Sequence, residues 1–551
     1  MSVDGLFAPA VLGVAPAIGR GTLDGYDAGS GTKSGAGVGD GIDTVAEARE
    51  LVAGLLARPW GQVSASPYET GRLVSLAPWL AGHTERIRFL LATQRPDGGW
   101  QSSGDHALVP TLSAVEALLA EIGRGTFADP DLLVKAADHG LEAVRNHSCS
   151  AASLPDTPAI ELIVSSLFSL IDGHLDGEGP KPPPGVDGAK LAAVRAWLTS
   201  GAEIPQKLVH ALEVAGAEAT AASGILPTPM PGGMAAVGAS PAAGAAWLAA
   251  SPGSGPGDAA VRHYLEAVVA STGGPVPCAL PITVFERGWT LSWLRRAGIP
   301  VDVSPELAAS LRDGLSPEGT ATGPGLPEDA DTTSVALYAL ALIGEPHEPE
   351  GLWPFETETH FCTWRGEEGM SPTTNAHVLD AFGEYLRRCG GEPRHEAVVT
   401  KLAAWLRDRQ EVDGSWTDRW HVSPYYATAC CAIALREFGG EESAGAVGGA
   451  VEWVLGTQRA DGSWGRWEGS AEETAYALQT LVLTGAALGE ERWREAVERG
   501  YRRLAAIRDG AAPSLWVDKD LYLPVAIVRA AVLGALHLAR RALSLPEGDS
   551  Y

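Results

Sequence analysis

Long apolar runs are missing from this sequence. Stretches such as Val525–Leu536 are interrupted by an arginine and are too short to cross a bilayer, so we expect no membrane span. The N-terminus also lacks the basic start and the apolar stretch of a signal peptide. Both absences argue against a secreted or membrane protein and favour a cytoplasmic one.

Cysteine is scarce as well, with 6 residues in a chain of 551. Two of them, Cys430 and Cys431, are adjacent. Disulfide frameworks belong mainly to small secreted domains, so we expect free thiols in a reducing compartment. A chain of this length can bury two or three domains with substantial cores.

Basic residues are outnumbered, because 41 Lys and Arg stand against 68 Asp and Glu. The resulting net charge of −27 argues against nucleic acid as a partner, since phosphate backbones attract basic surfaces. It leaves room for a small diphosphate ligand, because Mg²⁺ can bridge acidic side chains and phosphate oxygens.

Strand signals are sparse, and helical periodicity dominates from about Thr44 onward. Ala, Leu and Val recur there at three- and four-residue spacing, which is typical of helices. Clear examples are residues 45–57, 191–198, 335–343, 397–406 and 472–483. Residues 1–43 are rich in Gly, Ala and Ser without sustained periodicity, which predicts a disordered leader. The Pro-rich stretch at 179–186 predicts a loop, and residues 226–258 are similarly dense in Gly, Pro and Ala.

Three segments share the pattern Gln-x-x-Asp-Gly-x-Trp, namely Gln94–Trp100, Gln410–Trp416 and Gln458–Trp464. The last two begin 48 residues apart, a spacing typical of helix-pair arrays. The Asp-Gly pair supplies a turn, and the amide and indole can tie adjacent helix ends together. We interpret these repeats as structural. They predict curved layers of antiparallel helices that close into an α/α toroid.

Residues 327–334 place two aspartates, Asp329 and Asp331, one residue apart and just before the apolar run 335–343. One carboxyl group can orient the other, so the pair can deliver a single proton in one direction. The alternative is helix capping, because Asp, Thr and Ser accept backbone N–H groups at helix starts. Capping needs one such residue, whereas five of the six residues in 328–333 are polar.

Together with the repeats, Asp-Ala-Asp-Thr resembles the Asp-x-Asp-Asp signature of class II terpene cyclases, which protonate an alkene with a side-chain carboxylic acid. The chain looks like their bacterial diterpene type, the copalyl diphosphate synthases. Further ordered segments over some 450 residues are similar to elements of that family: Ser66–Thr70, Thr157–Ile163, Val284–Trp289, Ser371–Val378, Asp418–Tyr426 and Leu515–Tyr522.

The resemblance implies an all-α fold of two α/α-barrel domains, called β and γ, with QW-like repeats. It implies a β domain made of residues 44–71 and 286–551, a γ domain inserted between them at 72–285, and a substrate held between the two. The Asp-Asp-x-x-Asp motif of class I synthases is missing. The product is therefore expected to keep its diphosphate.

The resemblance makes Asp331 the general acid and Asp329 the residue that orients it. Thr332 stands where the family often has a third aspartate, although an Asp-x-Asp-Thr-Thr variant is familiar in bacterial members. Asn375 and His377 are implied as neighbours that stabilise the carboxylate left after proton transfer. For His377 a core or helix-surface position is the alternative.

A migrating carbocation needs stabilisation without a nucleophile, which aromatic faces provide. Among the 17 tryptophans, Trp289 and Trp420 are the candidates for the cavity, with Tyr425 beside the second of them. Each lies in a segment that is similar to the family. Most other tryptophans, including those of the repeats, are expected to be structural.

The resemblance also suggests residues for the end of the reaction. In the plant ent-copalyl enzymes a His and an Asn hold a water that removes the last proton. The His matches His210, and the Asn position matches Cys278, whose thiol cannot hold water as an amide does. This departure leaves a rearranged or differently deprotonated bicycle open. Helix packing against Glu213 is the alternative role of His210.

Diphosphate binding is less clearly marked. Arg419 matches a lysine of the plant motif and is a candidate phosphate ligand, although a surface ion pair with Asp418 is the alternative. Glu161 and Asp156 are candidate Mg²⁺ ligands in the γ domain. Lys190 and Arg195 are possible phosphate ligands, with a solvated helix face as the alternative.

The resemblance therefore implies a class II cyclase that turns geranylgeranyl diphosphate into a bicyclic diterpenyl diphosphate of labdane (copalyl), halimane or clerodane type. A class I terpene synthase is a possible downstream partner. Farnesyl diphosphate is the alternative substrate, and a squalene-type triterpene cyclase fits the chain length less well. Other α/α toroids are glycosidases, which need two separated carboxylates, or non-catalytic binding proteins.

Overall fold

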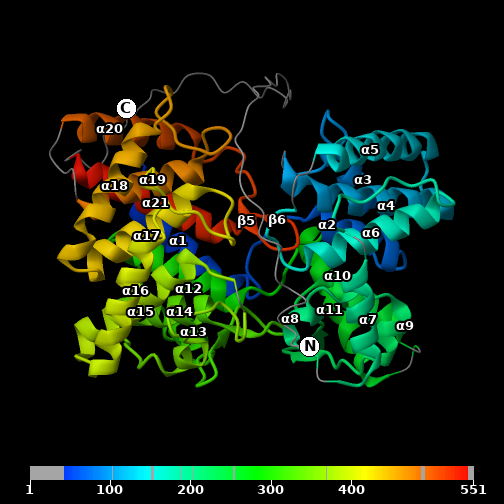
Figure 1. Cartoon of the computed structure of the whole chain (residues 1–551), viewed down its shortest axis with the longest axis horizontal. Coiled ribbons are helices and arrows are strands. Elements are labelled where there is room, and N and C mark those ends of the chain that lie inside the picture. Colours follow the sequence, from blue (N-terminus) through cyan, green and yellow to red (C-terminus); the bar gives the residue numbers. More distant parts are fainter. Residues whose placement is uncertain are drawn as a thin grey trace.

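The computed structural model describes residues 42–543 except 102–103, 151–153, 187, 203, 252, 254, 368 and 486–490. Nearly all of the leader predicted for residues 1–43 lies outside the described residues. Helices make up most of the described chain, and its strands are short hairpins, so the all-α prediction is confirmed. The helices form two bodies that lie side by side (Figure 1).

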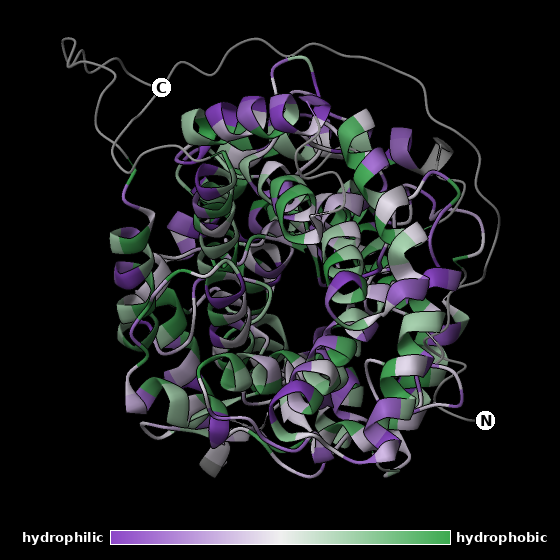
Figure 2. Cartoon of the chain, turned by 90° about the vertical axis from the view of Figure 1, so that its left-hand side faces the viewer, coloured by the Kyte–Doolittle hydropathy of each residue, from purple (hydrophilic) through white to green (hydrophobic). Residues whose placement is uncertain are grey.

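The β domain, on the left of Figure 1, is a closed double ring of helices. Its inner helices follow one another around the ring, and the last of them packs on the first. They are α12 (Thr283–Arg296), α14 (Ala330–Leu342), α15 (Pro372–Cys389), α17 (Pro424–Phe438), α19 (Ala471–Thr484) and α21 (Val525–Ala542). Figure 2, which faces this domain, shows the helices arranged around a central axis.

Each inner helix of the β domain packs against one or two outer helices. These outer helices are α1 (Thr44–Ala57), α13 (Pro305–Arg312), α16 (Pro393–Asp408), α18 (Ala444–Gly456) and α20 (Glu491–Ile507). Because α1 contacts both α12 and α21, the first helix of the chain helps to close a ring built from its second half. A single large hydrophobic core fills the domain.

The γ domain is formed by one continuous stretch of chain. Helices α2 (Pro67–Leu76), α4 (Leu108–Arg124), α6 (Ile160–His174) and α10 (Pro241–Ala250) line its interior, with the 3₁₀ turn η3 (Leu212–Val214) between the last two. The remaining helices are α3 (His83–Thr93), α5 (Pro130–Ser150), α7 (Ala189–Thr199), α8 (Gln206–Val209), α9 (Ala217–Ala222) and α11 (Pro256–Thr272).

The described strands form three antiparallel two-stranded hairpins. They pair β1 (Thr228–Met230) with β2 (Met234–Ala236), β3 (Thr320–Ala321) with β4 (Glu328–Asp329), and β5 (Trp516–Val517) with β6 (Leu521–Tyr522). The β5–β6 hairpin lies between the two domains (Figure 1). Further 3₁₀ turns are η2 (Asp105–Ala107), η4 (Glu350–Phe355) and η5 (Glu441–Ser443).

The hydrophobic cores divide the chain between Leu55 and Tyr68 and again between Leu280 and Ile282. Residues Ala48 to Leu55 belong to the β core, whereas Tyr68 belongs to a γ core. Helix α2 packs on α4 and α10, so the segment from Pro67 is part of the γ domain although the predicted boundary at residue 71 left its first half in the β domain. On the other side, Leu280 is in a γ core and Ile282 is in the β core.

The three Gln-x-x-Asp-Gly-x-Trp segments make the same contacts. Each tryptophan is fully buried, and its indole N–H donates to a carbonyl near the end of the preceding outer helix, as Trp464 does to Val454 at 2.7 Å. Each glutamine amide donates to a carbonyl of the next outer helix, as Gln458 does to Ala496 at 2.9 Å. The repeats therefore join successive helix pairs, as predicted for a structural role.

The glycine of each repeat is required by its backbone. Gly98, Gly414 and Gly462 have φ of 85°, 96° and 90°, a region that side chains disfavour. A Cβ atom on any of them would also collide with a backbone carbonyl of the neighbouring helix. The turn can therefore press against that helix only if it carries glycine.

One stretch of the described chain, Asp105–Arg124, is long and apolar enough to cross a membrane by length and hydropathy. Most of its apolar window, 72%, is buried inside the protein. It contains α4, whose faces pack on α2, α5 and α6. Its hydropathy is therefore explained by its position inside the γ domain.

Candidate active site

A cavity of about 600 Å³ lies between the two domains. Its lining comes from the γ domain at Leu154–Leu162, Lys207–Ala211 and Cys278, and from the β domain at Asp329–Thr332 and Trp516–Lys519. Most of the exposed surface inside is apolar, which suits a hydrocarbon chain. Residues from distant parts of the sequence meet here, so the cavity is the candidate active site.

The two aspartates of the sequence motif lie where the β3–β4 hairpin passes into α14. Asp329 is the last residue of β4 and the N-cap of α14, and its carboxylate accepts the Thr332 N–H at 2.6 Å. Asp331 sits in the first turn of the helix, and both carboxyl groups line the cavity. Capping therefore falls on Asp329, and the Asp331 carboxyl group is left to face the cavity.

His377, on α15, lies against the acid. Its Nδ1 is 2.7 Å from Oδ1 of Asp331. Burial alone would lower the pKa of His377, but the Asp331 carboxylate outweighs burial and raises that pKa well above its usual value. The ring and the carboxyl group therefore hold a proton between them.

Asp329 is in a different electrostatic state. Burial, together with the nearby Asp331 and against the opposing Thr332 N–H, raises its pKa to about 8. Asp329 is therefore a neutral carboxylic acid at neutral pH. A second negative charge beside Asp331 is avoided.

Thr332, which replaces the third aspartate, lines the cavity and lies 3.0 Å from the Thr322 hydroxyl, Oγ1 to Oγ1. The two hydroxyls satisfy each other without adding a negative charge. The motif therefore contains two carboxyl groups here: that of Asp329 is neutral, and that of Asp331 is paired with His377.

Three predicted site residues point elsewhere. The Asn375 amide is fully used by Phe361 and Ser371 backbone groups at 2.8–3.0 Å, which shapes the loop before α15. Trp289 is buried behind His377, with ring centroids 5.3 Å apart, and donates to the Tyr426 hydroxyl at 2.8 Å.

Tyr425 packs against Trp453, with ring centroids 4.7 Å apart, whereas its neighbour Tyr426 accepts the Trp289 indole N–H. Asn375, Trp289 and Tyr425 are all absent from the cavity lining. Trp289 supports the acid from behind, and the other two have structural contacts.

Aromatic side chains do line the cavity, although only one of them was predicted. Trp420 is that residue, and it meets Trp364 edge-on at 5.0 Å between ring centroids. Phe285, Trp516 and Tyr522 complete the aromatic lining. These rings offer the π faces that a carbocation needs.

Charged residues gather around Arg419, and we call Asp156, Glu161, Lys207, Glu367 and Arg419 the charged cluster. All five line the cavity. Arg419 forms ion pairs with Glu367 and, at 3.0 Å, with Asp156. Glu161 forms an ion pair with Lys190. Arg195, by contrast, donates to the Val214 and Ala215 carbonyls and is structural.

The expected Mg²⁺ ligands can be compared with this geometry. Asp156 and Glu161 both line the cavity and both have a cationic partner. Within the described residues no three His, Cys, Asp or Glu side chains form a ready-made metal site. Two carboxylates still fit Mg²⁺ when substrate phosphates and water complete its shell.

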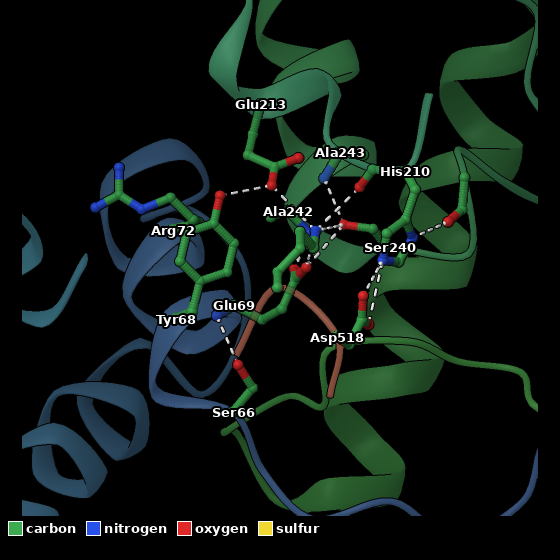
Figure 3. A network of polar contacts seen from close by, with 12 residues as sticks. Ser66, Tyr68, Glu69, Arg72, His210, Glu213, Ser240, Ala242, Ala243 and Asp518 are labelled. Carbon is green, nitrogen blue, oxygen red and sulfur yellow. Dashed lines mark hydrogen bonds and ion pairs between the residues drawn. The ribbon is translucent and has the colours of Figure 1, made fainter. Parts of the chain in front are cut away.

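His210 lines the cavity, but both of its ring nitrogens face acceptors. Nδ1 lies 2.6 Å from the Gly238 carbonyl oxygen, and Nε2 lies 3.1 Å from Oδ1 of Asp518 (Figure 3). Burial would lower the pKa of His210, but Asp518 and the carbonyl raise it. Both N–H groups of the ring are thus used by these acceptors, which leaves neither for the water that His210 was expected to hold.

Asp518 is the carboxylate of this group, and Cys278 hydrogen-bonds to it. Burial raises the pKa of the Cys278 thiol well above its usual value, so the thiol stays protonated and its S–H donates a hydrogen bond to Asp518. Burial opposes ionisation of Asp518, yet His210, with Lys519 and the thiol, holds its pKa at about 2. His210, Cys278 and Asp518 form one cluster, which we call the His210 cluster.

Lys519 follows Asp518 in the hairpin turn and is buried in the γ domain. It forms ion pairs with Glu69 and, at 3.0 Å, with Glu213, and it donates to the His210 carbonyl. On its other side, Asp520 accepts the Ser66 hydroxyl at 2.7 Å and the Tyr68 N–H at 3.2 Å. The turn that carries Asp518 is therefore fixed to the γ domain from both sides.

Sequence reasoning missed Asp518, Lys519 and Lys207. The first two lie in Leu515–Tyr522, a segment already singled out, but their partners are some 300 residues away. An unusual Asp-Lys-Asp in a segment rich in apolar residues was the available signal. Lys207 stands three residues before His210 and carried no signal of its own.

Comparison with known proteins agrees with this geometry. The squalene-hopene cyclase C-terminal domain family matches residues 370–507, which lie in the β domain. An ent-copalyl diphosphate synthase of Streptomyces sp. (strain KO-3988) is 41% identical over 504 residues, covering 90% of this chain and 96% of the relative. A labda-7,13-dienyl diphosphate synthase of Streptomyces clavuligerus is 38% identical and covers 92% and 94%.

The fold is shared with a solved relative as well. The ent-copalyl diphosphate synthase from Streptomyces platensis superposes with a TM-score of 0.83 at 42% sequence identity, covering 90% of this chain and all of that one. Both the family match and the full-length likeness include the segment that carries His377 and Arg419. The chain belongs to the class II diterpene cyclases, the enzyme family that includes the copalyl diphosphate synthases.

Proposed function

We propose that this enzyme converts geranylgeranyl diphosphate into a bicyclic diterpenyl diphosphate. The observation that carries the proposal is Asp331, a carboxyl group that faces a largely apolar cavity and is held by His377 at 2.7 Å. The printed names of the relatives, which are copalyl and labda-7,13-dienyl diphosphate synthases, support a product that keeps its diphosphate.

Proton transfer begins at Asp331. A hydrocarbon chain in the cavity displaces water, and a dry site disfavours separated charges on His377 and Asp331. The neutral arrangement then has the ring donating Nδ1–H to one carboxyl oxygen, while the other oxygen carries the proton that goes to the alkene. Asp329 contributes by staying neutral, and the His377 hydrogen bond stabilises the carboxylate left behind.

The cation that forms is protected by the cavity lining. Phe285, Trp364, Trp420, Trp516 and Tyr522 present ring faces or edges, which attract positive charge without forming a bond. The Trp516 indole is held by Glu472 at 2.8 Å, so its ring has a fixed orientation. The chain of the substrate can therefore fold and close two rings before a proton is lost.

The charged cluster suits the diphosphate. Arg419 and Lys207 are the cations that line the cavity there, and Asp156 and Glu161 are the carboxylates that would hold Mg²⁺. Mg²⁺ held there would supply positive charge that offsets part of the charge of the diphosphate. Arg419, which pairs with Asp156, would add a second positive charge beside it.

The product leaves with its diphosphate intact, so a class I terpene synthase is the kind of enzyme that would use it next. We place the reaction in the cytoplasm, which accords with the free thiols of the described cysteines. Because the chain belongs to a family of cyclases, we no longer keep the non-catalytic binding protein or the glycosidase as alternative functions.

The test is incubation of purified protein with geranylgeranyl and farnesyl diphosphates, with and without Mg²⁺, followed by phosphatase treatment and mass spectrometry. We expect a bicyclic diterpene alcohol that appears only after phosphatase treatment, and little turnover without Mg²⁺. Direct release of a hydrocarbon and pyrophosphate would contradict the proposal. Preferred turnover of farnesyl diphosphate would make the enzyme a drimane-forming cyclase instead.

A further inference from the structure

The His210 cluster contains one group that can accept a proton from the substrate. His210 donates from both ring nitrogens, and Cys278 donates its S–H. The Asp518 carboxylate receives from both of them, and its side chain is 14% exposed to the cavity that it lines. A carboxylate has about four lone-pair sites, so two donors leave room for a third contact.

We propose that Asp518 is the base that ends the cyclisation, and that His210 and Cys278 position it. The inference rests on the proposed function, because it concerns the final step of that reaction. Asp518 takes a hydrogen as H⁺ from a carbon next to the cationic centre. The electrons of that C–H bond form the new double bond, and Asp518 becomes a carboxylic acid that later releases its proton to water.

The number of protons on the substrate is the same before and after one turnover. Asp331 gives one proton to the substrate, and Asp518 removes one from it, so substrate and product are isomers. Water that re-enters the cavity after product release returns both groups to their starting states. No oxidant, reductant or further reactant is needed.

A weakly basic carboxylate is sufficient here. A tertiary carbocation is so acidic that any nearby lone pair can deprotonate it, and position then decides which hydrogen is lost. A carboxylate beside a cation can also attack it and form an ester. The hydrogen bonds from His210 and Cys278 occupy lone pairs of Asp518, which lowers its nucleophilicity and restricts its direction.

The position of Asp518 is unusually well fixed. Lys519 anchors one side of the turn to Glu69 and Glu213, and Asp520 anchors the other side to Ser66. These contacts lie within the protein, so the turn is held in place before the substrate binds. A base that selects one hydrogen among several neighbours needs such a fixed geometry.

The experiment compares wild-type protein with Asp518→Asn, using geranylgeranyl diphosphate and Mg²⁺. Substrate consumption and the profile of dephosphorylated products are measured separately. We expect consumption to persist, because Asp331 is intact, while the share of the wild-type alkene falls about tenfold, a change of about 1.4 kcal/mol in relative barriers. Isomeric alkenes and hydroxylated bicycles should take its place.

Asp520→Asn is the matched control, because it lies two residues away in the same turn and outside the cavity lining, and its amide oxygen can still accept the Ser66 hydroxyl and the Tyr68 N–H, so the anchor is kept. It should keep the wild-type product profile. Asp518→Glu is the second variant and moves the carboxylate by one methylene, so it should yield an isomeric alkene even if Asp518→Asn is poorly folded.

Two results would overturn the inference. One is the wild-type profile from both Asp518 variants, and the other is an equal shift in Asp520→Asn. If wild-type protein fails to convert geranylgeranyl diphosphate at all, the proposed function itself falls. That outcome is separate from a failure of the role given to Asp518.

Discussion

The Nδ1 atom of His377 lies 2.7 Å from Oδ1 of Asp331, and Trp289 packs edge-on against the same imidazole ring at 5.3 Å between centroids. The indole of Trp289 is in turn held by the Tyr426 hydroxyl. Three inner helices of the β domain therefore fix the orientation of one carboxyl group. A proton is delivered along a direction that the protein sets before substrate arrives.

Replacing Asp331 by asparagine should reduce cyclisation to background, because the amide keeps the shape of the side chain but has no acidic proton. Loss of a positioned acid typically costs about 10²- to 10⁴-fold in rate. Product formation by mass spectrometry and the circular dichroism melting curve are the measurements. Glu328→Gln, an exposed change three residues earlier, is the control. Normal turnover by folded Asp331→Asn protein would remove the acid assignment.

Asp329 should make stability depend on pH. The folded protein keeps the Asp329 proton up to a pKa of about 8, whereas the unfolded chain loses it near pH 4. Because the folded state binds the extra proton between these values, its stability should fall as pH rises through the window, by about 1.4 kcal/mol per pH unit for this group.

Urea unfolding from pH 5 to pH 8 checks this dependence. The curve of Asp329→Asn should be flatter than that of the wild type, because asparagine does not titrate. Glu328→Gln provides the comparison, since Glu328 is exposed. Parallel curves for all three proteins would show that Asp329 ionises normally.

Arg419→Met should weaken binding of the diphosphate. A hydrogen bond to a charged group contributes about 1.5–3 kcal/mol, so KM for geranylgeranyl diphosphate should rise about tenfold or more while kcat changes less. Steady-state kinetics at several Mg²⁺ concentrations are the measurement. Arg494→Met, on an exposed face of α20, is the control and should leave KM unchanged. A pure kcat effect would place Arg419 away from the phosphates.

Trp464→Phe should destabilise the β domain without changing the product. The substitution removes the indole N–H that donates to the Val454 carbonyl and leaves a small void, which should cost about 1–3 kcal/mol. Chemical denaturation measures the loss. Trp467→Phe alters an indole that is 42% exposed and should change stability by less than about 0.5 kcal/mol. Equal effects of the two substitutions would argue against the repeat as a structural tie.

The sequence was sufficient for the fold because its repeats are local. The hydrogen bond from Trp464 to the preceding helix spans ten residues, and the same spacing recurs at Trp416 and Trp100. The two aspartates were also recognisable, since they are neighbours in the chain. In both cases the residues that act together are close to one another in the sequence.

Contacts across the domain interface could not be foreseen in the same way. Asp518 and His210 are 308 residues apart, and no periodicity relates them. A sequence motif also does not show which way each of its side chains points. Tyr425 and Tyr426 are adjacent on α17, yet Tyr425 contacts Trp453 and Tyr426 contacts Trp289. Which face of a buried helix meets the cavity depends on the packing of every other helix.

The ring of the β domain closes through Thr44, whose hydroxyl lies 3.1 Å from Nδ1 of His537, 493 residues further along the chain. During synthesis the γ domain, which is one continuous segment, can fold while α1 waits for its partners. Asp331 leaves the ribosome well before the β5–β6 hairpin that carries Asp518. The group that starts the reaction therefore exists for a time without the group that ends it, and a growing chain has no finished cavity in which to make a cation.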